Sequence, residues 1–277
     1  MTASAKKLRL NRIFHGRTRG ILVVAFDHPL VLGPIPGTED AAGQIRRFVK
    51  AGCDGLLLSP GLLRHCADAL LVPAMPGIIA RIDWSTIWGS PETIAAKQAR
   101  SRLLARPEEA MRLGADAVIT YLVVGTGDSE FEAGEIARNA EVARECETLG
   151  MPLIVESLAR GPKVQDYRDP QWIKYHTRIA AELGADVIKT DYAGNVASMA
   201  GVIKECPIPI LVLGGSRTGS DEEALQTVRE IAQSGAAGVF FGRNVFQAAN
   251  VEIFLAKARS ALANGEGKRP AASGSPG

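Results

Sequence analysis

A lysine stands at the end of one apolar run of the sequence. Val187 and Ile188 are typical of a buried strand, and Lys189 follows them directly. Burial removes water from an ammonium group, which lowers the pKa of a lysine and makes it a nucleophilic amine. Such an amine can attack a ketone and form a Schiff base. The alternative is a lysine whose charged head reaches solvent past the strand end.

An acid and a histidine end another apolar run, residues 21–26, which is followed by Asp27 and His28. An iminium formed on a lysine is an electron sink, so it permits C–C bond formation or cleavage at the neighbouring carbon. A carboxylate beside it can move protons or hold substrate hydroxyls. Asp27 is therefore a candidate partner of Lys189, and the alternative is a structural cap.

Two glycine-containing turns indicate a phosphate site. Gly214, Gly215 and Ser216 follow one apolar run, and Gly242 and Arg243 follow the next. Backbone N–H groups of such turns, together with a helix N-terminus, bind phosphate, and an arginine adds a charge-assisted contact. The turns predict a phosphorylated substrate, and ordinary tight turns are the alternative.

No metal site is predicted. The histidines fall in separate predicted elements and the cysteines lack CxxC spacing: His15, His28, His65, His176, Cys53, Cys66, Cys146 and Cys206. We therefore expect neither a metal nor another cofactor, and we interpret the cysteines as reduced residues of a cytoplasmic protein.

Composition excludes some classes of function. The chain has 277 residues, 46% of them hydrophobic and 22% charged, and a net charge of +2, so no nucleic-acid or membrane partner is expected. We find neither a secretory signal nor an apolar stretch near the ~18 residues that a membrane span needs. Six basic residues cluster before Asp27, which predicts a solvated or subunit-contacting helix: Lys6, Lys7, Arg9, Arg12, Arg17 and Arg19.

Eight apolar runs predict eight buried parallel strands. They are residues 21–26, 55–59, 77–82, 117–124, 152–157, 187–189, 208–213 and 238–241. The longer helices are expected at 39–51, 91–113, 129–149, 170–183 and 245–263. At four helix-to-strand joints a glycine ends the helix and a small residue precedes the strand: 51–55, 113–117, 183–187 and 234–238.

Eight strand–helix units with right-handed crossovers predict a single-domain α/β fold, a (β/α)8 TIM barrel over residues 21–263. An open doubly wound sheet is the alternative. Residues 1–20 form the basic segment, and the Gly- and Pro-rich residues 264–277 are expected to be disordered. Catalytic groups of a barrel lie at the carboxyl ends of the strands, where the candidates cluster: Asp27, His28, Ser59, Asp83, Ser85, Thr86, Tyr121, Glu156, Lys189, Gly214, Gly215, Ser216, Gly242 and Arg243.

Motifs along most of the chain carry a family resemblance. They are Phe26-Asp27-His28, Gly150-Met151-Pro152-Leu153-Ile154, Arg160-Gly161, Arg168-Asp169-Pro170, Gly184-Ala185-Asp186-Val187-Ile188-Lys189-Thr190, Gly214-Gly215 and Gly242-Arg243-Asn244. Together they resemble the DhnA-type class I aldolases: archaeal-type fructose-bisphosphate aldolase, the archaeal ulosonate synthase and autoinducer-2 phosphate thiolase. The resemblance implies a homo-oligomer in which Lys189 forms the Schiff base beside Asp27. It also implies a phosphate site at Gly215, Ser216, Gly242 and Arg243.

The sequence departs from that family in its acid–base residues. The family's Tyr-Pro-Arg-Gly segment is here Leu158-Ala159-Arg160-Gly161, and Glu156 stands where the sugar aldolase has an aromatic residue. We hypothesise that Glu156 or Tyr121 takes over proton transfer. Arg81 and Asp83, with Ser85, are expected to bind a different, amino-acid-like acceptor aldehyde.

The sequence thus predicts a lyase, a class I aldolase that joins a dihydroxyacetone-phosphate-like donor to an aldehyde. Aspartate semialdehyde is the candidate acceptor, which would give a seven-carbon amino-sugar-acid phosphate. Fructose-bisphosphate aldolase, a transaldolase-type ulosonate synthase and a thiolase acting on a phosphorylated diketone are the alternatives, the last two being transferases. A non-catalytic sugar-phosphate-binding barrel is an alternative of another class.

Overall fold

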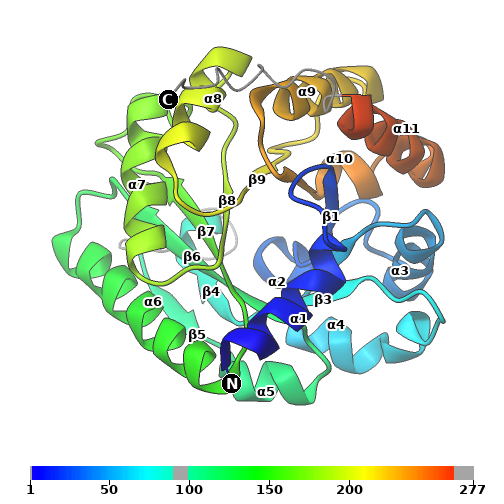
Figure 1. Ribbon diagram of the computed structural model, residues 1–277, viewed down its shortest axis with the longest axis horizontal. Helices are drawn as coiled ribbons and strands as arrows, with labels where there is room; N and C mark the ends of the chain where they lie inside the picture. The colour runs from blue at the N-terminus through cyan, green and yellow to red at the C-terminus, as the bar shows by residue number, and fades with distance from the viewer. Residues whose placement is uncertain (1, 90–98, 265–277) are drawn as a thin grey trace, which may run out of the picture.

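Eight parallel strands form a closed barrel in the computed structural model, which describes residues 2–89 and 99–264 (Figure 1). Their order around the barrel is β1-β10-β9-β8-β7-β6-β3-β2. The strands are β1 Ile21–Ala25, β2 Gly55–Leu58, β3 Gly77–Arg81, β6 Ala117–Val124, β7 Leu153–Ala159, β8 Val187–Thr190, β9 Ile210–Leu213 and β10 Gly238–Phe241. The predicted barrel is confirmed, and the open sheet is wrong because β1 pairs with β10.

The helices surround the barrel (Figure 1). The longer ones are α3 Ala41–Lys50, α6 Ser129–Leu149, α7 Pro170–Glu182, α8 Val196–Glu205, α9 Asp221–Ser234 and α11 Val251–Asn264. Shorter ones are α2 Pro29–Leu32, α4 Pro60–His65, α5 Pro107–Arg112 and α10 Arg243–Phe246, with 3₁₀ turns at Ala67–Leu70 and Thr86–Trp88. None of the helices in the described part of the chain is long and apolar enough to cross a membrane.

Local sequence sets the ends of the longest helix, α6. The Asp128 carboxylate accepts the backbone N–H of Phe131 and caps the first turn. Gly150 ends the helix with φ 61° and ψ 33°, a left-handed conformation that glycine adopts without steric cost. The predicted bounds of this helix are therefore confirmed.

The inner face of the barrel changes from apolar to polar along the strands. Side chains two residues apart on a strand share a face. An apolar residue in the core of the barrel is followed two positions later by a polar one on four strands: Ile79 and Arg81, Ile119 and Tyr121, Ile154 and Glu156, Val187 and Lys189. The same alternation that fills the core therefore brings polar side chains together at the carboxyl ends.

The third strand–helix unit differs from the prediction. Instead of a helix over 91–113, the structure has an antiparallel hairpin of β4 Asp83–Ser85 and β5 Ser101–Leu103, then α5. Pro107 favours the first position of a helix and keeps the preceding Arg106 extended, so a helix begins there and not earlier. Residues 91–98 of the predicted helix lie outside the described residues.

The end of the chain also needs correction. The predicted helix over 245–263 is divided into α10 and α11, because the chain leaves helical geometry after Phe246 and re-enters it at Val251. Of the tail predicted to be disordered, Asn264 is the last residue of α11, and the remainder lies outside the described residues.

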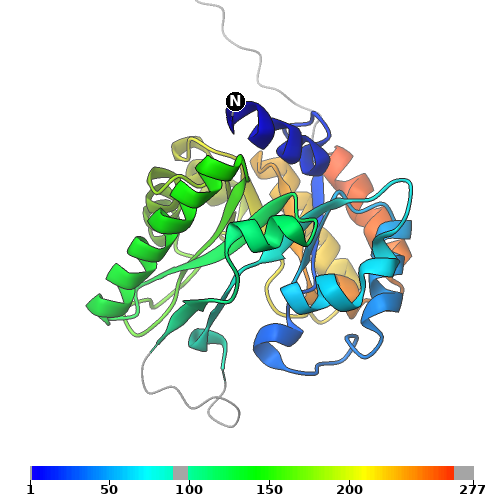
Figure 2. The same cartoon turned by 90° about the horizontal axis from the view of Figure 1, so that it is seen from below.

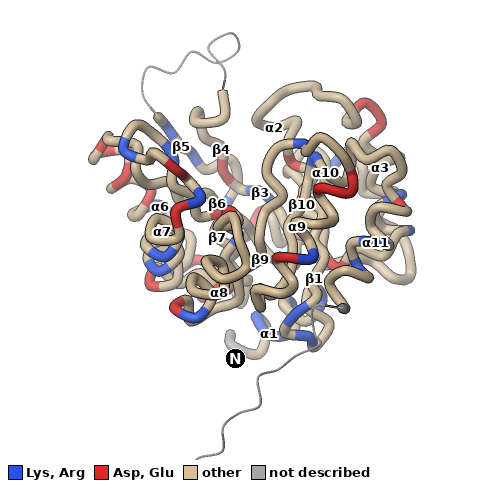
Figure 3. The backbone as a smooth tube through the Cα atoms, turned by 90° about the horizontal axis from the view of Figure 1, so that it is seen from above, with Lys and Arg blue, Asp and Glu red and all other residues tan. Residues whose placement is uncertain are grey.

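The basic N-terminal segment forms a helix, α1 (Thr2–Phe14), that lies across the amino-terminal end of the barrel (Figures 2 and 3). Ile13 is fully buried and belongs to the same apolar cluster as the barrel interior. A Cβ atom added at Gly77 would lie 2.4 Å from Ile13 Cγ1, so the helix sits directly on the start of β3. The predicted helix exists, but it closes the bottom of the barrel and is not simply solvated.

Three aspartates at the helix-to-strand joints explain the basic cluster. Each carboxylate accepts a backbone N–H from a neighbouring strand: Asp54 from Leu22 at 2.8 Å, Asp116 from Ile78 at 2.9 Å and Asp186 from Leu153 at 2.8 Å. The same carboxylates bind Arg17, Arg12 and Lys6, respectively. The basic residues therefore fix the segment to the barrel.

Candidate active site

A cavity of about 390 Å³ lies at the carboxyl ends of the strands. This end of the barrel is opposite the end on which α1 lies (Figure 3). Most of the predicted site residues line it: Asp27, His28, Tyr121, Glu156, Lys189, Gly214, Gly215, Ser216, Gly242 and Arg243. Arg81, Asp83 and Ser85 do not. The closed barrel brings these residues together because all of its parallel strands end on one side.

Lys189 is buried on β8, with 6% of its surface exposed. Its Nζ atom lies 2.9 Å from Glu156 Oε1 and 4.8 Å from the ring centroid of Phe240. Glu156 is the residue paired with Lys189 in the register between β7 and β8. The amine is thus held inside the cavity by a carboxylate and does not extend into solvent past the strand end.

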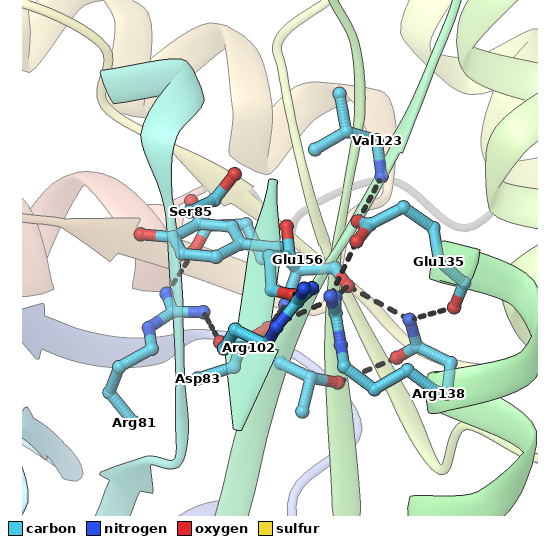
Figure 4. A network of polar contacts seen from close by, with 12 residues as sticks. Arg81, Asp83, Ser85, Arg102, Val123, Glu135, Arg138 and Glu156 are labelled. Atoms are coloured by element: carbon cyan, nitrogen blue, oxygen red, sulfur yellow. Dashed lines mark hydrogen bonds and ion pairs between the residues drawn. The ribbon is translucent and has the colours of Figure 1, made fainter. Parts of the chain in front are cut away.

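Arg81 lies behind the wall of the cavity and is fully buried. Its Nε atom donates to Asp27 Oδ2 at 2.9 Å, Nη2 donates to Glu156 Oε2, and Nη1 donates to Asp83 Oδ1 at 3.4 Å (Figure 4). The guanidinium carbon stacks 3.8 Å from the ring centroid of Tyr121. One cation therefore joins two of the acids predicted to take part in chemistry.

Charge keeps these two acids ionised. Burial alone would raise the pKa of Asp27, but the positive charges of Arg81 and Lys189 outweigh it and lower that pKa below its usual value. The pKa of Glu156 is likewise lowered, because Lys189 and Arg81 together outweigh the effect of burial. Burial raises the pKa of the Tyr121 phenol well above its usual value. At neutral pH the cavity therefore offers two carboxylates and a neutral phenol.

Asp83 and Ser85 also lie away from the cavity. Asp83 is fully buried, accepts the backbone N–H of Tyr121 at 2.7 Å and pairs with Arg138 at 3.2 Å (Figure 4). Ser85 is on the hairpin strand β4 with 1% of its surface exposed. The expectation that Arg81, Asp83 and Ser85 touch an acceptor aldehyde is thus revised, because these side chains are enclosed by partners within the protein.

The two glycine turns form one surface of the cavity. Asn244 joins them, since its Nδ2 atom donates to the carbonyl oxygens of Gly214 at 3.0 Å and Ser216 at 3.1 Å. A Cβ atom at Gly242 would lie 2.2 Å from His28 Cε1 and 2.9 Å from the carbonyl oxygen of Ala25, so only glycine fits there. The hydrogen bonds by which Asn244 connects the two turns were not predicted, although Asn244 directly follows Arg243 in the sequence.

His28 lies between the turns and the carboxylates. Burial is the main cause that lowers its pKa to about 4; Asp27 opposes the shift, while Lys189 and Arg243 reinforce it. Its Nδ1 atom is 3.7 Å from Asp27 Oδ1 and has no hydrogen-bond partner within the described structure. His28 is therefore a neutral imidazole at pH 7, with one nitrogen left for a ligand or water.

A second ion pair in the cavity, between the partly buried Arg160 and the buried Asp191, was missed by sequence reasoning. Arg160 binds Asp191 through two parallel contacts of 2.8 and 2.9 Å, and its guanidinium stacks 4.6 Å from the Tyr167 ring centroid. Trp88 lines the same region. Asp191 follows Lys189 by two positions, so extending the polar inner face of β8 by one step would have found it.

No group of three or more His, Cys, Asp or Glu side chains within residues 2–89 and 99–264 is placed to hold a metal ion. The described cavity offers instead an amine, three carboxyl groups (Asp27, Glu156 and Asp191), an imidazole and the two glycine turns.

The chain matches a family of barrel enzymes. Residues 21–248 match the family described as DeoC/LacD family aldolase. The chain belongs to this family. Class I aldolases of this family form a Schiff base on a lysine. The resemblance inferred from the motifs is confirmed.

Individual relatives support this assignment to the aldolase family. It is 34% identical over 268 residues to 2-amino-4,5-dihydroxy-6-oxo-7-(phosphonooxy)heptanoate synthase of Streptomyces griseus, covering 97% of this chain and 93% of the relative. It is 36% identical to 2-amino-3,7-dideoxy-D-threo-hept-6-ulosonate synthase of Halobacterium salinarum, covering 89% and 87%. A solved Schiff-base-forming fructose-1,6-bisphosphate aldolase superposes with a TM-score of 0.78 at 29% identity, covering 94% of this chain and 98% of the other.

Proposed function

We propose that this class I aldolase forms its Schiff base on Lys189 with a dihydroxyacetone-phosphate-like ketone and joins that donor to an aldehyde. The observation that carries the proposal is the position of Lys189: its amine lies in a cavity that also contains two ionised carboxylates and two glycine turns. The turns with Arg243 bind the phosphate, and the amine attacks the ketone carbonyl with loss of water. The iminium then loses a proton from the neighbouring carbon and becomes an enamine.

Glu156 moves that proton in our proposal. Its Oε1 atom is 2.9 Å from Lys189 Nζ, so it is close to the nitrogen that becomes the imine. The enamine carbon attacks the aldehyde carbonyl, the new alkoxide takes up a proton, and water releases the product from Lys189. The position that carries the family's tyrosine is Leu158, which is fully buried and apolar, so the proton must come from another group. Tyr121, whose phenol is neutral at pH 7, is the second candidate donor.

The acceptor in our proposal is an aldehyde that carries an amino acid group, with aspartate semialdehyde as the candidate. The name of the Streptomyces product contains a ketone next to a phosphate ester and an α-amino acid at the other end. Breaking its C4–C5 bond gives a three-carbon ketone phosphate and a four-carbon amino-acid aldehyde. Arg160 and Asp191 offer a cation and an anion to such an acceptor. Arg160 follows β7, which lies on the side of Lys189 away from the glycine turns in strand order, and Asp191 follows β8, the strand of Lys189 itself.

Fructose-bisphosphate cleavage is a second candidate function. The likeness to a solved Schiff-base-forming aldolase supports it. In that case Arg160 would meet a second phosphate instead of a carboxylate. The two candidates share the donor and differ only in the acceptor.

Borohydride trapping tests the proposal. The protein is incubated with dihydroxyacetone phosphate and sodium borohydride, and the reduced adduct is located by peptide mass spectrometry. We expect one adduct on the peptide that contains Lys189 and none in Lys189→Met. An adduct on a different lysine, or none with any ketone phosphate, would reject the proposed mechanism.

Product analysis then separates the two acceptors. The protein with dihydroxyacetone phosphate receives either aspartate semialdehyde or glyceraldehyde 3-phosphate, in the presence of excess EDTA. The proposal predicts a faster rate with aspartate semialdehyde, and the opposite order would favour fructose-bisphosphate chemistry.

A further inference from the structure

Arg81 binds one carboxylate oxygen of Asp27 and one of Glu156, and the other oxygen of each acid is left on the cavity side. Its Nε atom binds Oδ2 of Asp27, and Oδ1 is left at 3.7 Å from the cavity residue His28. Its Nη2 atom binds Oε2 of Glu156, and Oε1 is left at 2.9 Å from Lys189 Nζ. In each acid one oxygen is held from behind and the other faces the cavity.

The arginine reaches these acids across the barrel interior. Arg81 is at the end of β3, Asp27 follows β1, and Glu156 is on β7, so the three come from strands that are not neighbours in the barrel. A fully buried arginine is stable only when acids surround it, and here three acids and an aromatic ring do so. The planar fork of a guanidinium can hold several acceptors at fixed angles, which an ammonium group cannot.

We propose that Arg81 is a positioning residue that holds Asp27 and Glu156 in their reactive orientations and selects the oxygen of Glu156 that faces Lys189. The proposal rests on the imine mechanism above and extends it to a residue that touches no substrate. Burial alone would favour the protonated form of the acids, and a protonated Glu156 could not act as a base toward the iminium.

The network contains a matched control. Arg138 is a second arginine of the network, partly buried, which binds Asp83 at 3.2 Å, Glu135 at 2.5 Å and the carbonyl oxygen of Tyr121 at 2.7 Å (Figure 4). Among the described contacts it makes none with Asp27 or Glu156. Its removal should therefore disturb the same region without releasing the two acids.

The test compares Arg81→Lys, Arg81→Met and Arg138→Lys with the unaltered enzyme. Turnover and the rate of borohydride trapping with dihydroxyacetone phosphate are measured between pH 5 and 9 together with KM. We expect both Arg81 variants to lose about 10²-fold in kcat, because the reacting groups are misplaced. KM for the ketone phosphate should stay within about twofold, because Arg81 lies outside the cavity.

The pH profile gives a readout that a structural role alone would not move. The carboxylates now have lowered pKa values, so their ionised form persists to low pH. Without the charge of Arg81 that form is lost at a higher pH as the pH falls, so the acid limb of the profile moves upward in Arg81→Met. Arg138→Lys should keep the limb in place. Guanidinium ion added to Arg81→Ala should restore part of the rate.

Three outcomes would overturn the proposal. The acid limb of Arg81→Met coincides with that of the unaltered enzyme, or Arg81→Lys keeps the kcat of the unaltered enzyme, or both Arg81 variants fail to fold by circular dichroism while Arg138→Lys folds. A different result marks failure of the proposed function itself: the unaltered enzyme forms no adduct on Lys189, and the role of Arg81 falls with it.

Discussion

Glu156 has surroundings that are unusual for a glutamate. It is 5% exposed, binds one cation with each oxygen, and stands at a position where the resemblance implies an aromatic residue. An acid placed there makes the carboxyl end of β7 reactive in a way that an aromatic ring is not. In our proposal, proton transfer therefore depends on this substitution.

Glu156→Gln should separate imine formation from proton transfer. The amide has the same shape but cannot take up a proton, so the adduct with Lys189 should still form. Exchange of the donor's α-proton with D₂O, followed by NMR, should fall about 10²- to 10⁴-fold. The control is Glu135→Gln, which alters a buried glutamate outside the cavity. If Glu156→Gln exchanged at the original rate, Tyr121 would become the favoured acid–base residue.

For single residues, the sequence predicted which side chains meet at the carboxyl ends of the strands better than it predicted their ion pairs. Lys189, Asp27 and Glu156 were placed together because each ends an apolar strand. The ion pairs of Arg81 could not be predicted, because they depend on the strand register and on side chains that cross the barrel. An arginine with so little exposure is not indicated by composition or periodicity.

At the scale of elements, the turns after β9 and β10 form the proposed phosphate site. Their backbone is held by the Asn244 side chain and by close packing of Gly242 against β1. The turn geometry therefore depends on glycine at that position more than on any side chain of the turn.

Gly242→Ala should weaken binding of the phosphorylated donor. The added Cβ would collide with His28 and with a backbone carbonyl, so the turn must move away from its place. We expect KM for the ketone phosphate to rise about 10- to 100-fold through lost hydrogen bonds. Gly134→Ala in α6, where no atom lies within 4 Å of the new Cβ, should leave KM unchanged. An unaltered KM in Gly242→Ala would move the phosphate site elsewhere.

Element prediction failed where tertiary pairing replaces local preference. The hairpin of β4 and β5 is built from two short segments that are each too small to show a period, and Asp83 pairs with Leu103 across it. By contrast α6 was predicted with the bounds that the structure has, because Gly150 marks its end in the sequence; the Asp128 cap at its start is a finding of the structure.

At the scale of the whole molecule, one end of the barrel carries the cavity and the other end is closed by α1. The cavity lies at the carboxyl ends of the strands, and α1 closes the opposite end through Ile13 and the three aspartates of the joints (Figure 3). In a barrel these two tasks are separated along one axis. The homo-oligomer implied by the resemblance stays a prediction, which light scattering would check.

Ile13→Ala should reduce stability without changing catalysis. The side chain is fully buried between α1 and the barrel, so its loss should lower the free energy of unfolding by about 2–5 kcal/mol. Leu8→Ala, which alters a residue of the same helix that is 69% exposed, should change it by less than about 0.5 kcal/mol. Chemical denaturation measures both, and KM should be the same in both variants. A changed KM in Ile13→Ala would show that the two ends are coupled.

The docking of α1 has a consequence for how the chain is built. Lys6 binds Asp186, a partner 180 residues further along, and Arg12 binds Asp116. During synthesis the first helix leaves the ribosome long before those carboxylates exist, so it can find its place only when strand β8 is made. The segment that is translated first is thus among the last to be fixed, and a chain that stops before Asp186 lacks β8, β9 and β10 and cannot close the barrel on which α1 docks.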